Sequence, residues 1–268
     1  MTRRADILLL NINNTNTSFA LATPSRIVRV VKQPTATLRG IPFVKRPIRH
    51  IVFASVVPAA TRRMLAQLPV KPFVVTGTAD LGIGVRYPHK RQIGADRLAN
   101  AVAAVHLYGA PAIVVDFGTA VTFDIVNARR EYIGGVIAPG LSAVTDYLYQ
   151  RTALLPRIRV VEPRSVVGKS TVAAMRVGAI IGYRGLVKEI LAALRREPGM
   201  AHAIIVATGG YAHLIAQKIP GIRHVNPLLT LEGLRFIYRH QCHESQACHS
   251  ERSEESRRIG GSPSRRSG

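Results

Sequence analysis

The sequence predicts an α/β protein with two mixed sheets, one in each half of the chain. Short apolar runs typical of buried strands alternate with Ala- and Leu-rich segments typical of helices. Three strand-like segments open the chain before helices and strands begin to alternate, which favours antiparallel and parallel pairing in the same sheet. The same strand–turn–strand pattern returns in the second half. We therefore expect a duplicated domain whose two copies enclose one ligand in a cleft.

The composition is that of a globular protein, with 47% hydrophobic and 19% charged residues among 268. Lys and Arg number 37 against 15 Asp and Glu, a net charge of +22. The basic residues are scattered, and no helix-turn-helix, zinc-finger or aromatic-interleaved motif accompanies them, so we do not expect nucleic acid as the partner.

The sequence also indicates a compartment. No signal peptide and no membrane span are expected, because Arg3 and Arg4 precede an apolar run that is soon broken by Asn residues. Cys242 and Cys248 both lie near the C-terminus, so no disulfide framework supports the core. We expect a cytoplasmic protein.

The first half is expected to contain a three-stranded meander followed by alternating elements. The expected strands are residues 6–11, 17–22, 26–32, 50–57 and 72–76, and the expected helices are residues 59–68 and 95–107. Pro58 ends the fourth strand, and Gly94 precedes the second helix.

The second half repeats the alternation. The expected strands are residues 112–115, 120–127, 131–140 and 203–208, and the expected helices are residues 141–151, about 170–194, 211–219 and 229–238. Ser170 or Thr171 is expected to cap the long helix. We place one lobe at residues 1–111, a second at residues 112–239 and a disordered basic, Ser-rich tail at residues 240–268.

The turn after the strand at residues 112–115 has the chemistry of a polyphosphate site. Asp116 ends the strand, Gly118 follows, and Thr119 and Thr122 supply hydroxyl groups. Glycine lets the backbone approach a ligand closely, and backbone N–H and hydroxyl groups donate to phosphate oxygens. The carboxylate can hold a cation.

The first half carries a similar turn at residues 11–18, directly after the apolar run at residues 7–10. In register, Asn11 lies over Asp116, Asn13 over Gly118, Asn14 over Thr119 and Thr17 over Thr122. Two ordinary hairpins rich in turn-forming residues would also explain the pattern. The repeated polar order favours two phosphate-binding turns.

Asp96 has two explanations. It falls in the first turn of the helix that follows Gly94, where the helix dipole alone favours an acid. A carboxylate beside Arg97 can also take a proton from a substrate hydroxyl while the guanidinium holds an anion. The local residues alone favour the first, structural explanation.

Taken together, these motifs resemble the type III pantothenate kinases, which belong to the acetate and sugar kinase/Hsc70/actin superfamily. The resemblance runs from about residue 6 to residue 239. It rests on residues 94–97, 116–120, 134–140, 171 with 174–176, and 229–234. It implies two duplicated ribonuclease-H-like (actin-like ATPase) domains with mixed sheets and an interdomain cleft.

The resemblance also implies a function. Members phosphorylate pantothenate with ATP to 4'-phosphopantothenate, the first step of coenzyme A biosynthesis, using Mg²⁺ with the nucleotide and K⁺ or NH₄⁺ as a monovalent cation. They are typically homodimers. By resemblance, Asp96 is the general base and Asp116 binds the monovalent cation. The implied ATP-binding residues are Asn11, Ile12, Asn13, Asn14, Thr15, Asn16, Thr17, Ser18 and Thr119, and the implied pantothenate-binding residues are Tyr87, Gly94, Ala95, Arg97 and Thr171.

The first turn departs from the family pattern. The family has Asp and Gly where this chain has Asn11 and Asn13. A neutral amide can orient a metal-bound water but adds no charge, whereas magnesium sites normally use one or two carboxylates. Three hypotheses follow: a working pantothenate kinase, a catalytically weakened nucleotide-binding homologue with a regulatory or accessory role, and, from the net charge alone, a nucleic-acid binder.

Overall fold

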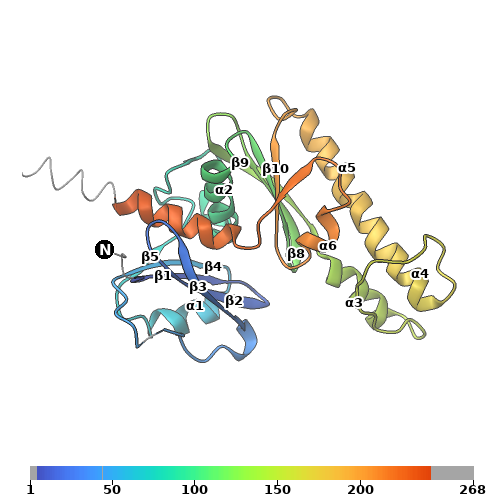
Figure 1. The fold of residues 1–268 in the computed structure, drawn as a ribbon, viewed down its shortest axis with the longest axis horizontal. Coiled ribbons are helices and arrows are strands. Elements are labelled where there is room, and N and C mark those ends of the chain that lie inside the picture. The colour runs from blue at the N-terminus through green and yellow to red at the C-terminus, as the bar shows by residue number, and fades with distance from the viewer. Residues whose placement is uncertain (1–4, 44, 243–268) are drawn as a thin grey trace, which may run out of the picture.

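The computed structural model describes residues 5–43 and 45–242 and contains two mixed sheets with helices between and outside them (Figure 1). The first sheet has the strand order β3-β2-β1-β4-β5. Its strands are β1 (Ile7–Ile12), β2 (Asn16–Ala22), β3 (Ile27–Pro34), β4 (His50–Ser55) and β5 (Phe73–Val74). The first three strands form the expected antiparallel meander, and β4 lies parallel to β1.

The second sheet repeats this order as β9-β8-β7-β10-β11 and adds β6 beside β9. Its strands are β6 (Gly84–Val85), β7 (Ala112–Phe117), β8 (Ala120–Val126), β9 (Glu131–Pro139), β10 (Ile204–Thr208) and β11 (Ile222–Val225). Again the first three strands of the copy are antiparallel and β10 lies parallel to β7. The predicted duplicated α/β fold is confirmed.

Two helices lie between the sheets. They are α2 (Ala95–Leu107) and the C-terminal helix, which begins at residue 229 and is helical to residue 242. One core cluster joins Leu9 and Val52 of the first sheet to Val102 of α2, Val126 of the second sheet and Leu234 of the C-terminal helix. The two halves therefore share one continuous core, and α2 reaches both sheets.

The outer faces of the sheets are covered separately. Helix α1 (Pro58–Leu65) packs Met64 against the outer face of the first sheet. The outer face of the second sheet is covered by α3 (Leu141–Arg151), α5 (Tyr183–Arg196) and α6 (Ala212–Ala216).

Several elements differ from the sequence prediction. The single helix expected up to Leu194 is α4 (Thr171–Val177), a π-helical turn η3 (Gly178–Gly182) and α5 in succession. The expected cap is present, since Ser170 Oγ accepts from Ala173 N at 3.2 Å. Strands β6 and β11 were not expected. Short 3₁₀ turns occur at η1 (Thr35–Thr37) and η2 (Lys90–Gln92).

The last helix is longer than predicted. Residues 240–242, placed in the tail by composition, are helical, and His240 Nε2 lies 2.9 Å from Asp80 Oδ1. The rest of the proposed disordered tail, residues 243–268, lies outside the described residues. The division into lobes at residue 111 stays a prediction. Within the described ranges, every helix is too short or too polar to span a bilayer.

Candidate active site

Asp116 ends β7 and lies between α2 and two glycine-containing turns. Its Oδ2 accepts a hydrogen bond from Asn100 Nδ2 at 3.2 Å. Its Oδ1 lies against the other side, where a Cβ added to Gly209 would be 2.5 Å away and one added to Gly118 would be 3.6 Å away. Burial raises the pKa of Asp116 to about 6, and the nearby charge of Asp96 raises this pKa as well.

The first turn has the predicted place but not the predicted length. Asn11 pairs with Ser18, whereas Asp116 pairs with Thr122, so the first turn is one residue longer than the second. The residue that corresponds to Thr122 is therefore Ser18 and not Thr17. The turn closes through a hydrogen bond from Asn13 N to Asn16 O at 3.0 Å.

Two buried side-chain oxygens of this turn have no hydrogen-bond partner among the described residues. They are the Oδ1 atoms of Asn11 and Asn13. Such oxygens normally find a partner in the protein, in water or in a ligand. Asn13 does not have positive φ, so the glycine found here in the family is not required by the backbone conformation of this chain.

The two turns touch each other. Thr15 Oγ1 and Thr119 Oγ1 lie 2.8 Å apart although the residues are 104 positions apart in the chain. Thr119 is held from behind by the turn before α3, because a Cβ on Gly140 would overlap the carbonyl oxygen of Thr119. The predicted meeting of the two turns is thus present in the fold.

Some predicted ATP-binding residues of the first turn have side chains that are too buried to contact a ligand. Ile12 is fully buried in the core beside α1, and Thr17 is fully buried with its hydroxyl 3.0 Å from that of Thr35. Thr35 in turn donates to Asn13 O at 2.6 Å and so supports the turn. Asn14 is exposed, and the side chains of Asn16 and Ser18 are partly exposed.

Asp96 lies in the first turn of α2, partly buried. Its Oδ1 accepts from Arg97 N at 2.8 Å. The carboxylate folds back over the helix start, so that a Cβ on Gly94 would lie 2.6 Å from Asp96 Oδ1. Burial raises the pKa of Asp96, against the opposing effects of the Arg97 backbone N–H and of the Arg97 guanidinium.

Arg97 is fixed by a carboxylate that the sequence analysis missed. Its Nε donates to Asp124 Oδ1 at 2.6 Å, and its Nη2 lies 3.5 Å from Phe123 O. A Cβ on Gly135 would overlap the guanidinium, so the glycine makes room for it. Asp124 is fully buried, and burial raises its pKa to about 7 although Arg97 lowers it. An acid at an inward-facing position of an apolar strand was the signal that could have found it.

Tyr87 lies on the same wall as Arg97. The Tyr87 and Tyr132 rings meet edge to face with centroids 6.3 Å apart, and the Arg97 guanidinium lies 5.9 Å from the Tyr132 ring centre. The predicted residues Tyr87, Gly94, Ala95 and Arg97 are thus grouped around the start of α2 and the β8–β9 pair.

Lys32 is a second residue that the sequence analysis missed. It pairs with Ser18 on β3, and Ser18 pairs with Asn11, so the three side chains share one face of the first sheet. Its positive charge lowers the pKa of Asp116, so it lies near the second turn as well. Only the strand register shows that Lys32 lies on the same face as Asn11, because the two residues are far apart in the sequence.

Thr171 is not part of this group. It is exposed at the start of α4, which lies at the far end of the molecule from α2 (Figure 1). Within one chain, Thr171 and Asp96 are not brought together.

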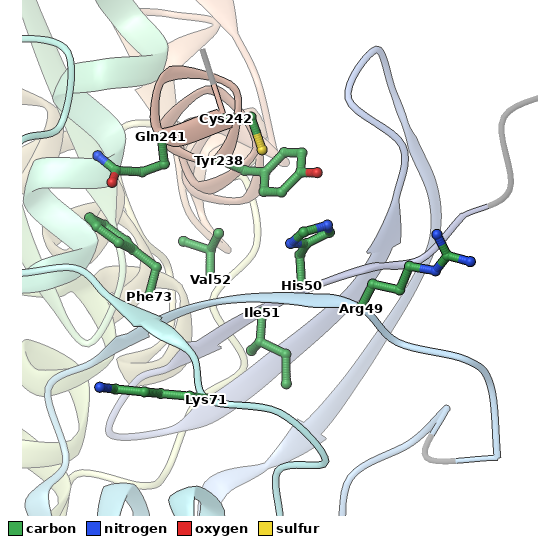
Figure 2. A pocket seen from close by; sticks show the side chains of 9 residues that line it. All are labelled: Arg49, His50, Ile51, Val52, Lys71, Phe73, Tyr238, Gln241 and Cys242. Carbon is green, nitrogen blue, oxygen red and sulfur yellow. The ribbon is translucent and has the colours of Figure 1, made fainter. Parts of the chain in front are cut away.

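Two hollows of the surface lie elsewhere. One, of about 470 Å³, lies between the edge of the first sheet and the C-terminal helix. Figure 2 shows that His50, Val52 and Phe73 face this helix there, whereas Ile51 and Lys71 lie on the other side of the strands, so its polar groups do not converge. The other, of about 540 Å³, lies beside β10 and β11. Neither contains a predicted site residue.

The residues at the turns suit a cation that arrives with a phosphate ligand. No three His, Cys, Asp or Glu side chains in residues 5–43 and 45–242 are grouped to hold a metal ion by themselves. Asp116 Oδ2 is bonded to Asn100 and Oδ1 faces Gly118 and Gly209, while the buried Asn11 and Asn13 oxygens have no partner among the described residues. One carboxylate together with neutral amide oxygens suits cations whose remaining ligands come from substrate phosphates and water.

Comparison with known sequences gives the family. The family model for type III pantothenate kinase matches residues 7–193. The type III pantothenate kinase of Akkermansia muciniphila is 50% identical over 235 residues, which cover 85% of this chain and 96% of that protein. That of Methylacidiphilum infernorum is 40% identical over 237 residues, covering 86% and 87%.

Solved structures agree in fold. A conserved protein from Campylobacter jejuni, assigned to the Baf family of transcriptional activators, is 18% identical with a TM-score of 0.60, covering 88% of this chain and 99% of that one. A 2-dehydro-3-deoxygalactonokinase candidate from Sinorhizobium meliloti is 12% identical with a TM-score of 0.55, covering 87% and 98%. At these identities the likeness concerns the fold alone. From the family model and the sequence relatives, this chain belongs to the type III pantothenate kinase family.

Proposed function

We propose that this chain transfers the γ-phosphoryl group of ATP to the hydroxyl of pantothenate, forming 4'-phosphopantothenate and ADP in the first step of coenzyme A biosynthesis. The observation that carries the proposal is the position of Asp96. Its carboxylate lies at the start of α2, one helical turn before Asn100, which bonds to Asp116, and its charge raises the pKa of Asp116. A proton acceptor therefore lies beside the turn that suits the polyphosphate.

Asp96 is the general base in this proposal. It accepts the hydroxyl proton as the substrate oxygen bonds to the γ-phosphorus, while the bond from that phosphorus to the β–γ bridging oxygen breaks and ADP leaves. A base works best when its pKa lies near the working pH, and burial moves the pKa of Asp96 upward towards it. In phosphoryl transfer the protein contributes mainly positioning and charge.

The two turns hold the nucleotide. Backbone N–H groups of residues 11–18, the Thr15 and Thr119 hydroxyls and the Lys32 ammonium are donors that suit phosphate oxygens. The Thr15–Thr119 contact of 2.8 Å supports this proposal, because it brings the donors of both turns to one point.

Arg97 and Tyr87 hold pantothenate. Asp124 fixes the Arg97 Nε, and the remaining guanidinium N–H groups can bind an anionic group such as the pantothenate carboxylate. Gly94 and Ala95 bring the backbone of the helix start close to the same place. The substrate hydroxyl then lies next to Asp96, which precedes Arg97 in the chain.

Asp116 would hold the monovalent cation, K⁺ or NH₄⁺, and the unpartnered Asn11 and Asn13 oxygens would help to hold the Mg²⁺ that accompanies ATP. These cations supply positive charge that stabilises the phosphate oxygens during transfer. The protein ligand for the monovalent cation would be Asp116 Oδ1, because Oδ2 accepts a hydrogen bond from Asn100 Nδ2 at 3.2 Å.

A homodimer accounts for Thr171. Thr171 can belong to a pantothenate site only if a second copy of the chain brings it there, since it is remote from Asp96 in one chain (Figure 1). The elements before α4 support such a contact, because large apolar side chains are exposed along α3 and the segment that follows it. These side chains are Val144, Tyr147, Leu154, Val166 and Val167.

A coupled assay with ATP, Mg²⁺, K⁺ and pantothenate tests the function. We expect phosphopantothenate from the wild-type chain and a loss of at least about 100-fold in kcat with Asp96→Asn, because general-base catalysis contributes about 100-fold to 10,000-fold. The control is Asp6→Asn, which removes a carboxylate that lies 3.9 Å from Arg49 near the N-terminus. No product from the wild-type chain at saturating nucleotide and K⁺ would overturn the proposal.

Mixing two inactive variants tests the shared site. Asp96→Asn chains and Thr171→Val chains are each expected to be impaired, and a mixture that exchanges subunits is expected to regain activity in the dimers that pair one chain of each kind. If the wild type is a monomer by light scattering, or if the mixture stays as inactive as its parts, Thr171 does not act from a partner.

A further inference from the structure

A buried amide on α2 links the C-terminal helix to Asp116. Asn100 is fully buried among alanines, including Ala99, Ala101 and Ala103. A buried amide is costly unless its donor and acceptor are both satisfied. Asn100 Nδ2 donates to Asp116 Oδ2 at 3.2 Å, and Asn100 Oδ1 accepts from Thr230 Oγ1 at 2.8 Å. Helix α2, the strand β7 that follows it and the distant C-terminal helix therefore meet in one short chain of hydrogen bonds.

The Thr230 hydroxyl decides which way the amide faces. An amide oxygen turned towards Asp116 would repel the carboxylate, so the NH₂ group must face it and the oxygen must face Thr230. Thr230 is a donor to that oxygen, and without it the amide oxygen would be buried and unpaired. The hydroxyl thus fixes the orientation of Asn100 through its oxygen, and Asn100 fixes Asp116 through its NH₂ group.

Close packing of two helices keeps the hydroxyl in reach. The C-terminal helix crosses α2 at Gly233, where an added Cβ would overlap the carbonyl oxygen of Ala99. Gly233 lies one turn after Thr230, and Ala99 directly precedes Asn100, so the crossing and the hydrogen bond share one place. The far side of the C-terminal helix is held by Arg235 Nη1, which donates to Pro24 O at 2.8 Å.

We propose that Asn100 and Thr230 are positioning residues for the monovalent cation site, acting through Asp116. They hold Oδ2 against α2 and so keep Oδ1 turned to Gly118 and Gly209, where it can meet the cation. The inference rests on the proposed function, because it takes Asp116 as the ligand of that cation. In this proposal the C-terminal helix, through one hydroxyl group, sets the geometry of the site.

The test measures how the affinity for ATP depends on the K⁺ concentration. The affinity is measured by calorimetry at constant ionic strength, with choline replacing K⁺. Thr230→Val keeps the shape of the side chain and removes the hydroxyl. We expect the K⁺ concentration for half-maximal effect on ATP affinity to rise about tenfold, in line with the loss of an outer partner of a metal ligand. Thr230→Ser restores the donor and is expected to return the value to that of the wild type.

The matched control is Thr61→Val in the first turns of α1, a partly buried threonine whose hydroxyl bonds to Ser55 Oγ at 2.7 Å. It is expected to lower thermal stability without changing the K⁺ requirement. A K⁺ requirement that Thr230→Val leaves unchanged in a folded protein would overturn the relay alone. ATP binding by the wild type that ignores K⁺ would overturn the cation site and the relay with it, whereas loss of turnover with K⁺-dependent binding retained would count against the kinase proposal only.

Discussion

At the scale of single residues, the proposed role of Asp96 as the base links the pH dependence of the rate to the surroundings of its carboxylate. The base must be ionised, and burial raises the pKa of Asp96 from its ordinary value near 3.8. We therefore expect kcat/KM to fall on the acid side at a higher pH than an exposed aspartate would give. Arg97→Gln removes a charge that lowers the pKa of Asp96, so it should move the acid limb further upward.

This is measured as kcat/KM between about pH 4 and pH 8 in wild type and variant. Arg63→Gln, on the exposed side of α1, is the control and should leave the limb in place. The pH of half-maximal kcat/KM is compared rather than the maximum value of kcat/KM, because Arg97 is also proposed to bind the substrate. An acid limb that stays unchanged in Arg97→Gln would contradict the assignment of Asp96 as the base.

In the proposed function, Asn11 influences how tightly Mg²⁺ is held. Asn11→Asp adds a carboxylate on the face shared with Ser18 and Lys32, so Mg²⁺ would gain a charged ligand. We expect the Mg²⁺ concentration for half-maximal activity to fall by about tenfold, with a higher rate at low Mg²⁺. The unliganded variant should be less stable, because Asn11 is buried and the new charge would be removed from water. A rate that is unchanged or lower at every Mg²⁺ concentration would contradict this prediction.

The sequence could name the residues of the turns but not all of their neighbours. Asp116, Asp96 and the first turn stand out because polar residues follow apolar strands or open a helix. Asp124 and Lys32 depend on strand register, and Asn100 depends on the packing of three elements. Register and packing are set by long-range contacts that no local pattern contains, so these residues were missed.

At the scale of elements, the crossing of α2 and the C-terminal helix leaves no room for a side chain. Gly233→Ala would push a methyl group against the Ala99 backbone, which cannot move as a flexible side chain can. We expect the free energy of unfolding to fall by about 1–3 kcal/mol. Gly185→Ala in α5, where nothing lies within 4 Å of the added Cβ, should instead raise it by up to about 1 kcal/mol. Urea unfolding of both variants checks the prediction, and equal effects would contradict it.

Long elements were predicted well and short ones poorly. The bounds of α2 agree with its apolar and Ala-rich pattern, and the meander of β1 to β3 was expected. Strand β6 has two residues, too few for a sequence periodicity. It is a strand because it pairs with β9, which the local sequence does not show. The π-helical turn at residues 178–182 was not predicted either, because such a turn does not change the helical pattern of the sequence.

At the scale of the whole molecule, buried acids make stability depend on pH. Burial raises the pKa of Asp124 to about 7 and that of Asp116 to about 6, above the ordinary 3.8. Between about pH 4 and pH 7 the folded chain therefore binds more protons than the unfolded chain. These groups should raise the free energy of unfolding as the pH falls from about 8 to about 5.

The test compares the free energy of unfolding of the wild type and of Asp124→Asn, both unliganded, by denaturant unfolding between about pH 5 and pH 8. Asp124→Asn cannot titrate at this position, so the gain in stability on acidification should be smaller in the variant than in the wild type. The result that would contradict the prediction is an equal pH dependence in both proteins.

The duplicated architecture was readable because each half repeats one strand order around one polar turn. How the halves are joined was not readable. Strand β6 comes from the first half and pairs in the second sheet, while the C-terminal helix comes from the second half and packs in the core of the first sheet. Both exchanges depend on contacts between distant segments.

The contact between Thr15 and Thr119 has a kinetic consequence. The tips of the two turns touch at 2.8 Å, so in the proposed function a triphosphate that binds between them enters only after the hydroxyls separate. In stopped-flow mixing, the observed rate of ATP capture should level off at high concentration, and the plateau should report how often the tips part. Replacing either threonine with alanine would lift that ceiling.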